Sequence, residues 1–420
     1  MNNKAVKVFL SVTLALVLVF GAVAVGMTVK NGRSVKEVSA SPFAEWFSKK
    51  EQTDAPSPSA DNPAPTEVPT EPQKAASLRM LSVGDNLIHD GIYEQAQKRA
   101  KNGGYDFSFC YARVKSTVEA ADIATINQET IVAKSYQPSG YPLFNSPQEL
   151  GAAVKDTGFD VVSLANNHML DKTAKGLTEA IDFWDAADGI TRTGAYKDKA
   201  DLERVEYIEK DGIKIGLVGI TQYLNGLSLP KDSPLQIILT GDEATIERKI
   251  KAAKAECDVV LVNVHWGTEY TTTPSQEQKN LAKKMASWGA NVIIGHHPHV
   301  LQPMEWIDNA DGTRTLVAYS LGNFISQQNT AARVIGGMLH YTLTKGTDGK
   351  ITVSDVLFEP TVTHYVSGSH DVQIYPLSQY SDALAKKQAG RIKQSDFSVA
   401  YIENFVKDVI PAEFLKAENT

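Results

Sequence analysis

Polar residues able to bind a metal ion recur directly after apolar runs in this chain. Asp85 follows the run LRMLSVG, and Glu129 follows ATINQ. A single residue of this kind usually caps a helix or completes a turn, and a lone histidine is usually structural. The same coincidence after six apolar runs instead predicts a shared site. The candidates are Asp85, Glu129, Asn166, Asn167, His168, His265, His296, His297, His299 and Asn323.

The residue types indicate a divalent cation with nitrogen and oxygen ligands. Histidine, carboxylate and amide side chains without cysteine suit Zn, Mn or Fe, and they disfavour a structural cysteine–zinc site. A bridging carboxylate between imidazoles can hold two ions about 3.5–4 Å apart, where they activate a water molecule. We therefore expect one or two ions. The chain has no G-x-S-x-G elbow, P-loop or dinucleotide fingerprint, which argues against those enzyme classes.

The elements that position these residues are predicted to be buried strands alternating with helices, as in an α/β fold. The carboxyl ends of parallel strands meet at one edge of a sheet, so the candidate residues would converge there. After Gly322 the pattern becomes strand-rich, which favours two sheets over one doubly wound sheet. The predicted strands span residues 78–84, 122–127, 159–165, 213–220, 258–265, 291–295, 315–321, 336–344 and 351–359. The predicted helices span residues 92–101, 108–119, 147–157, 174–187, 243–256, 275–289 and 397–417.

The amino-terminal part predicts a membrane anchor and a tether. Residues 8–29 contain no charged side chain, and as a helix they would span about 33 Å, enough to cross a bilayer core. A cleaved signal peptide is the alternative. The proline-rich residues 54–72 favour an extended, unfolded tether. We therefore expect a cytoplasmic tail at 1–7, one transmembrane helix at 8–29, a disordered stalk at 30–77 and a main domain outside the cell membrane.

Composition argues against some partners and sites. The 420 residues carry a formal net charge of −7, and there is no block of five like charges. Nucleic acid is therefore not an expected partner. The two cysteines, Cys110 and Cys257, are interpreted as small buried apolar residues rather than as a disulfide or a nucleophile.

The order of the motifs resembles the CapA/PgsA family of poly-γ-glutamate capsule synthesis proteins, in the calcineurin-like metallophosphoesterase superfamily. The resemblance covers roughly residues 78–325 and implies a four-layer α/β/β/α sandwich. We place this domain at 78–360 and a C-terminal extension packing on it at 361–420. The motifs are Gly84–Asp85, Asn127–Glu129, Ser163–Asp171, Val264–Gly267, Gly295–Pro303 and Tyr319–Phe324.

The resemblance also implies roles for the matching residues. The ligands of a first ion would be Asp85, Glu129 and His299, with Glu129 bridging to a second ion held by Asn167, His265 and His297. His168 would act in catalysis on the leaving group, and Asp171 either orients it or caps a helix. The usual first motif is D-x-H, but Leu87 stands at the histidine position and His89 is out of register.

Three functions remain open at this point. The resemblance implies a membrane-anchored factor for synthesis or export of an anionic polymer such as poly-γ-glutamate, with membrane synthase subunits as possible partners. The second is a metal-dependent hydrolase of phosphoesters or of the polymer's amide bonds. The third is a non-catalytic scaffold with a vestigial site.

Overall fold

The computed structural model of the protein describes residues 75–366 and 371–415. The predicted cytoplasmic tail at 1–7 and transmembrane helix at 8–29 lie outside them, as does nearly all of the stalk predicted at 30–77. Within the two described stretches, no helix is both long and apolar enough to cross a bilayer. The first strand begins at Ala76, so the folded domain includes the end of the predicted stalk.

The first of two β-sheets has eight strands. They are β1 (Ala76–Asn86), β2 (Ile123–Asn127), β3 (Val161–Ser163), β4 (Thr191–Thr193), β11 (Asn323–Ile325), β12 (Ile335–Lys345), β13 (Ile351–His364) and β14 (Gln373–Pro376). Their order is β14-β13-β12-β1-β2-β3-β4, with β11 beside the end of β1. From β1 to β4 the strands are parallel, whereas β12, β13 and β14 are antiparallel to their neighbours. The parallel half therefore brings its carboxyl ends to one edge.

The second sheet has six strands in the order β5-β6-β7-β8-β10-β9. They are β5 (Glu206–Lys210), β6 (Ile213–Thr221), β7 (Val259–His265), β8 (Val292–His296), β9 (Leu301–Asp308) and β10 (Arg314–Leu321). The four central strands are parallel, and β5 and β9 close the sheet as antiparallel edges. Strands β5 and β9 were not predicted from the sequence. Both lie at an edge of the sheet, and their side chains are only partly buried, so their apolar pattern is weak.

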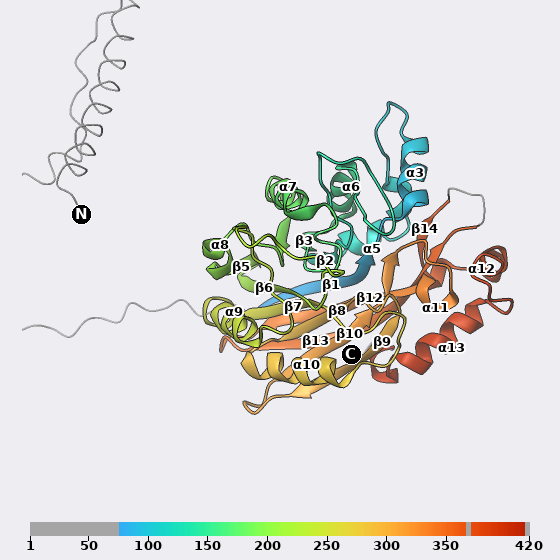
Figure 1. Cartoon of the computed structure of the whole chain (residues 1–420). Coiled ribbons are helices and arrows are strands. Elements are labelled where there is room, and N and C mark those ends of the chain that lie inside the picture. The colour runs from blue at the N-terminus through green and yellow to red at the C-terminus, as the bar shows by residue number, and fades with distance from the viewer. Residues whose placement is uncertain (1–74, 367–370, 416–420) are drawn as a thin grey trace, which may run out of the picture. The chain divides into compact units, whose positions relative to one another are not determined.

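Helices cover the outer faces of both sheets (Figure 1). The helices are α3 (Asp90–Arg99), α4 (Ser108–Tyr111), α5 (Lys115–Glu119), α6 (Glu149–Thr157), α7 (Thr173–Asp185), α8 (Lys199–Glu203), α9 (Glu243–Glu256), α10 (Gln276–Trp288), α11 (Ala331–Val334), α12 (Asp382–Ala389) and α13 (Val399–Val409), with 3-10 turns η1 (Leu377–Gln379) and η2 (Ala412–Phe414). In Figure 1, α6 and α7 lie over the first sheet, and α9 and α10 lie on the outer side of the second.

Alternate side chains of the second sheet face two different cores, as the period of a strand requires. Along β7, Val259 and Leu261 join the core shared with the first sheet, whereas Val260 and Val262 pack in the core formed with α9 and α10. A strand covered on both faces explains the continuous apolar run. The predicted mixed α/β architecture with two sheets is confirmed, with layers in the order helix, sheet, sheet, helix.

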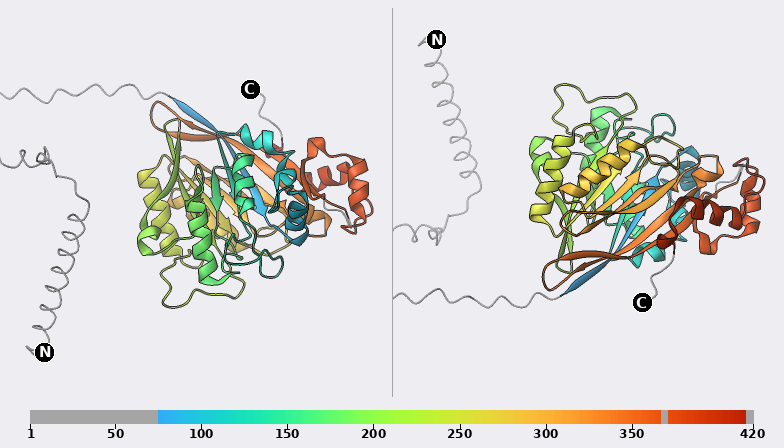
Figure 2. Two further views of the ribbon diagram at one scale, coloured as in Figure 1. Left: turned by 90° about the horizontal axis from the view of Figure 1, so that it is seen from above. Right: turned by 90° about the horizontal axis from the view of Figure 1, so that it is seen from below.

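Two local features differ from the predicted elements. The helix predicted at 108–119 is divided into α4 and α5, because the chain turns at 112–114 and buries Cys110, Val114 and Val118 together. Strand β13 runs across the predicted junction of domain and extension at 360 and 361. The described part of the extension adds β14 to the same sheet, and α12 and α13 lie at one end of the domain (Figure 2).

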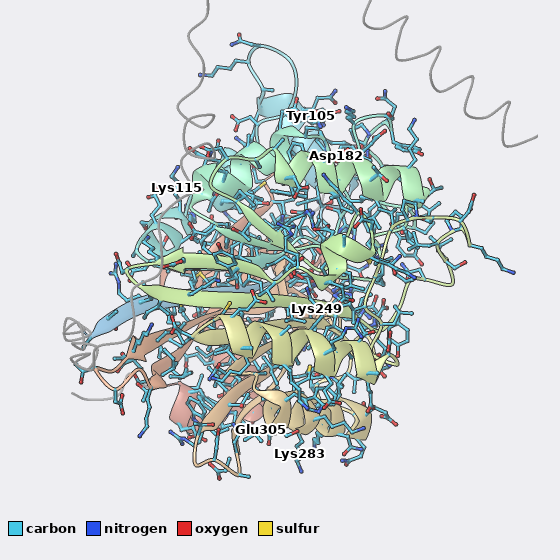
Figure 3. The ribbon with its side chains drawn as sticks, turned by 90° about the vertical axis from the view of Figure 1, so that its left-hand side faces the viewer. Tyr105, Lys115, Asp182, Lys249, Lys283 and Glu305 are labelled. Carbon is cyan, nitrogen blue, oxygen red and sulfur yellow. The ribbon has the colours of Figure 1, made fainter. Side chains whose placement is uncertain are left out.

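A buried ion pair joins α9 to the edge of the second sheet. Its lysine, Lys249, lies on α9 (Figure 3). Lys249 Nζ lies 3.2 Å from Glu206 Oε2 and donates to the carbonyl oxygens of Leu202 at 2.8 Å and Arg204 at 2.6 Å. Burial lowers the pKa of Lys249 and raises that of Glu206. The two charges compensate each other in a site that water does not reach.

Candidate metal centre

The predicted ligands meet where the carboxyl ends of the two sheets come together. Asp85 lies near the end of β1 in the first sheet, and Glu129 follows β2 by two residues. His265 is the last residue of β7 in the second sheet, and His297 and His299 follow β8. Asp85, Glu129 and His265 are fully buried, and one ligand atom of each lies within 4.8 Å of the others.

His265 Nε2 is the centre of a group of four potential ligand atoms. It lies 2.8 Å from Asn167 Oδ1, 3.1 Å from His297 Nδ1 and 3.6 Å from Glu129 Oε1. Two ligand atoms about 2.1 Å from one ion are roughly 3.0 Å apart at a right angle and roughly 3.4 Å apart at a tetrahedral angle. The three measured separations are of this size. These residues are the ones predicted to hold a second ion.

The electrostatics of the two imidazoles suit a metal ligand. Burial lowers the pKa of His265 well below its usual value, and the neighbouring His297 lowers it further. Burial also lowers the pKa of His297, to about 4. Both rings are therefore neutral at pH 7, and each keeps a nitrogen lone pair that an ion can accept.

The residues predicted to hold a first ion also lie together. His299 Nδ1 is 3.1 Å from Asp85 Oδ2, and His299 Nε2 is 3.5 Å from Glu129 Oε1. Burial acts to raise the pKa of Asp85, but hydrogen bonds with His296 and His299 hold it well below its usual range. Burial acts to lower the pKa of His299, but the charge of Glu129 and the bond with Asp85 raise it to about 9.

The surroundings of the Glu129 carboxylate show whether these residues suit a metal ion. Neither of its carboxylate oxygens has a hydrogen-bond partner among the described residues, although both are buried. Burial raises the pKa of Glu129 well above its usual value; the charge of Asp85 raises it further, and His299 opposes this. A buried carboxylate without hydrogen bonds is costly. A divalent ion between Glu129 and the surrounding imidazoles would compensate it, so the residues present fit a metal ion.

The loop after β8 is held in an unusual conformation. His297 and His299 have backbone φ angles of 98° and 57°, which residues other than glycine rarely adopt. At Gly295, a Cβ would lie 2.0 Å from the carbonyl oxygen of Tyr319 and 2.6 Å from Trp266 Nε1. Only glycine therefore allows β8 to pack this closely, and the strained loop that follows turns both imidazoles toward the cluster.

His168 and Asp171, the predicted catalytic pair, are in contact. His168 Nδ1 lies 2.7 Å from Asp171 Oδ2, which also accepts from the backbone N–H of Phe144 at 2.7 Å. Asn225 Nδ2 is 3.3 Å from the same imidazole nitrogen, and Asn225 Oδ1 accepts from Asn167 Nδ2 at 3.1 Å. The carboxylate thus orients the imidazole and leaves Nε2 available for proton exchange. Asn225 connects this pair to the predicted ligand Asn167.

The changed first motif keeps its imidazole out of the cluster. Leu87 is buried, and His89 Nδ1 lies 3.1 Å from the Leu87 carbonyl oxygen and 3.3 Å from the Gln327 backbone nitrogen. Burial lowers the pKa of His89 to about 4. Within the described stretches, no hydrogen bond or ion pair joins His89 to a predicted ligand. The first ion would therefore have only the three protein ligands predicted.

Three further residues complete the site without a role predicted from the sequence. Asn127 Nδ2 donates to Asp85 Oδ1 at 2.8 Å, and His296 Nδ1 lies 3.5 Å from the same oxygen. Both belong to motifs already noted, so their position carried a signal. Asn225 lies in an irregular loop outside those motifs, and only the tertiary structure brings it to His168.

Residues 79–328 match the family described as "Bacterial capsule synthesis protein PGA_cap". This range is more than half of the chain and contains every predicted site residue. The chain belongs to that family. The predicted resemblance to the CapA/PgsA proteins is thus confirmed.

Two CapA relatives agree with that assignment. The capsule biosynthesis protein CapA of Bacillus anthracis is 30% identical over 283 residues, which cover 66% of each chain. The PGA biosynthesis protein CapA of Bacillus subtilis is 30% identical over 279 residues, covering 65% of this chain and 70% of the relative. The solved NAD nucleotidase (NadN) of Haemophilus influenzae is 14% identical, with a TM-score of 0.44 over 80% of this chain and 60% of that one.

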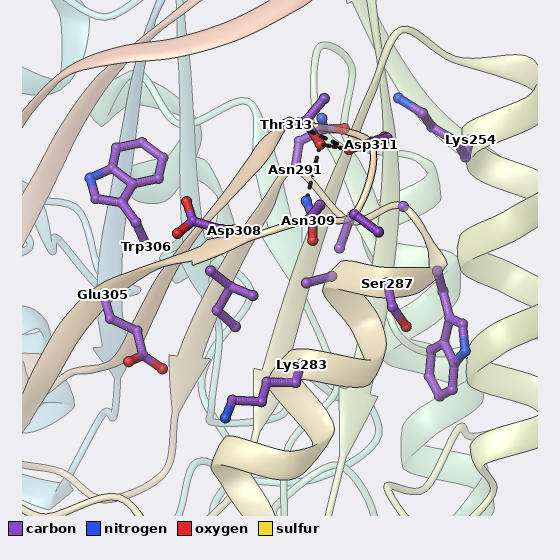
Figure 4. Close-up of a pocket in the computed structure, with 16 residues that line it drawn as sticks. Lys254, Lys283, Ser287, Asn291, Glu305, Trp306, Asp308, Asn309, Asp311 and Thr313 are labelled. Carbon is purple, nitrogen blue, oxygen red and sulfur yellow. Dashed lines mark hydrogen bonds between the residues drawn. The ribbon is translucent and has the colours of Figure 1, made fainter.

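A separate groove lies between α10 and β9 (Figure 4). It has a volume of about 690 Å³ and is lined by Lys254 and Lys283 of the helices and by Trp306 and Asp308 of β9. It also includes Asn291, which precedes β8, whereas the metal centre follows the other end of that strand. None of the predicted site residues lines it.

Proposed function

We propose that this protein takes part in the biosynthesis or export of poly-γ-glutamate or a related anionic capsule polymer, using a divalent-metal site. One observation carries the proposal: the buried Glu129 carboxylate has no hydrogen bond among the described residues but lies 3.6 Å from His265 and 3.5 Å from His299, in a member of a capsule synthesis family. Ions bound there would dominate the local field and attract a polyanion, despite the net charge of −7.

The proposal includes the place where the protein acts. The uncharged residues 8–29 would anchor the chain in the cell membrane, and residues 30–77 would hold the domain outside it. In this position the domain could meet the polymer as membrane synthase subunits deliver it. The relatives named for capsule and PGA biosynthesis support the polymer as a partner.

The chain's own residues would divide the work at the site. A bound Zn, Mn or Fe ion supplies Lewis acidity and a water molecule of lowered pKa. Asp85, Glu129 and the three ligand histidines would hold one or two ions in place. The Asp171 carboxylate keeps the His168 ring in one orientation. The strained loop after β8 keeps the imidazoles in place before any ion binds.

Metal content and polymer binding of the purified full chain test the proposal together. We expect elemental analysis to find a divalent metal, and poly-γ-glutamate to bind the metal-loaded protein more tightly than the chelated one. His297→Ala should lose both properties. His340→Ala, at a half-buried histidine that pairs with Glu359, is the matched control and should keep both. Bound metal without polymer binding would contradict the polymer proposal, and absent metal would leave only the scaffold function.

The His168–Asp171 contact supports a second candidate function, a metal-dependent hydrolase. An imidazole oriented by a carboxylate at 2.7 Å is suited to proton transfer to a leaving group. Hydrolysis of phosphoesters and of poly-γ-glutamate should be measured with Mn, Zn and Fe. If the hydrolase is real, His168→Ala should lower turnover about 100-fold or more while keeping metal content. No turnover of either substrate by metal-loaded protein would exclude it.

A further inference from the structure

Among the described residues, Arg333 beside the metal centre has no counter-ion. The Cζ of Arg333, in α11, lies 3.3 Å from the centroid of the Tyr270 ring, so the guanidinium stacks on the aromatic face. Within residues 75–366 and 371–415, this guanidinium makes no hydrogen bond or ion pair. A stacked arginine keeps its planar N–H donors available for an oxyanion.

Two separate connections tie Arg333 to the predicted ligand His299. The rings of Tyr270 and His299 have centroids 6.1 Å apart and are tilted by 32°. The carbonyl oxygen of Arg333 accepts from Asn323 Nδ2 at 2.9 Å, and Asn323 Oδ1 lies 3.0 Å from His299 Nδ1. The arginine is therefore held beside the metal centre by both its side chain and its backbone.

The backbone of Tyr270 is fixed next to the loop that carries His297 and His299. Its φ angle is 65°, and its backbone N–H donates to the Pro298 carbonyl oxygen at 2.7 Å, next to both ligand histidines. A second exposed tyrosine, Tyr223, packs on His297 with ring centroids 5.2 Å apart. The two tyrosine side chains are 43% and 40% exposed, so the metal centre has an accessible aromatic border rather than a closed one.

We propose that Arg333, held on the face of Tyr270, binds a carboxylate of the anionic polymer and so directs the chain to the metal centre. This inference rests on the proposed polymer function and adds the residue that recognises the substrate. A guanidinium pairs with a carboxylate through two parallel hydrogen bonds. The exposed parts of the Tyr223 and Tyr270 side chains can contact the methylene and amide groups between successive carboxylates. The charge of Glu269, which acts on both Tyr270 and His299, would repel an incoming carboxylate, and the charge of Arg333 would oppose this repulsion.

Binding of poly-γ-glutamate to the full-length, metal-loaded chain tests this assignment. Arg333→Met should raise the Kd about tenfold or more. Arg333→Lys should recover part of the lost affinity, because it keeps the charge but lacks the planar guanidinium. Tyr270→Leu should weaken binding, whereas Tyr270→Phe should not. Metal content should stay at the wild-type level in all four variants.

Arg314→Met is the matched control. Arg314 also stacks on an aromatic ring, that of Trp306 at 4.4 Å, but it begins β10, whereas Asn323 follows the other end of that strand. Its removal should leave polymer binding unchanged. If Arg333→Met binds poly-γ-glutamate as tightly as wild type, the Arg333 assignment is wrong while the polymer function stands. If wild type itself binds no polymer, or binds an amidated neutral polymer equally well, both proposals fail.

Discussion

Glu129 combines complete burial with a lack of hydrogen-bond donors, which makes it the most direct probe of the metal proposal. Its folded-state pKa is raised, so above its unfolded pKa the folded state holds the proton more tightly than the unfolded state does. Without metal, Glu129 therefore lowers the free energy of unfolding as the pH rises. A bound cation would remove this cost.

Glu129→Gln keeps the shape of the side chain and removes its charge. In the presence of a chelator at pH 8, we expect the variant to melt at the same temperature as wild type or higher. In the presence of Mn or Zn, wild type should gain stability and bind metal, whereas the variant should bind it at least about tenfold more weakly. Thermal unfolding and elemental analysis of both proteins check this, and equal metal binding would contradict the bridging role.

His364 contacts the C-terminal segment through its imidazole ring. Its Nδ1 lies 2.9 Å from the hydroxyl of Tyr380 and 3.1 Å from Gln388 Oε1, which belongs to α12. Burial lowers the pKa of His364, although the bond with Gln388 acts to raise it. His364 therefore binds a proton more tightly in the unfolded chain than in the folded protein, and this difference favours unfolding in acid.

We expect the free energy of unfolding to fall as the pH drops below about 6.5, with His364 contributing at most about 1.4 kcal/mol per pH unit. His364→Asn keeps a polar atom near the Nδ1 position but cannot take up the proton. Denaturant unfolding at pH 5, 6 and 7, with chelator present throughout, should give a shallower slope for the variant. Equal slopes for the two proteins would show that His364 does not contribute to the pH dependence of the free energy of unfolding.

At the scale of elements, the attachment of α9 to the second sheet depends on the buried pair Lys249–Glu206. Lys249→Met leaves a buried carboxylate without its counter-ion and should destabilise the protein by about 3–5 kcal/mol. Replacing both partners with apolar residues should recover most of that loss. The exposed pair Lys284–Glu243, which joins α10 to α9 at 2.6 Å, is the control, and its loss should cost about 1 kcal/mol or less. Denaturant unfolding of the four proteins measures these differences.

At the scale of the whole molecule, the proposed anchor makes a prediction about location. Protease added to intact protoplasts should digest the domain from residue 78 onward, because we propose that it lies outside the membrane. Deleting residues 8–29 should keep the domain inside the cell and protect it. Protection of the full-length chain in intact protoplasts, with digestion only after lysis, would contradict an extracytoplasmic domain.

The sequence by itself determined the elements that carry the site, because their signals are local. Apolar runs that end in Asp85, Glu129 or His265 predict buried strands with polar residues at their carboxyl ends, and β1, β2 and β7 are those strands. The continuous apolar run of β7 also indicated burial on both faces. The edge strands β5 and β9 carried a weaker signal, since one side of each faces partly toward solvent.

Only the tertiary structure decided how these residues meet. The distance between His265, at the end of β7, and Asn167, in the loop after β3, depends on how the two sheets pack, which no local pattern records. The same packing leaves Glu129 without donors and sets Arg333 on Tyr270, residues that are 63 positions apart. Residue types and their order predict which chemistry is possible, whereas contacts between distant segments determine which atoms are close enough to perform it.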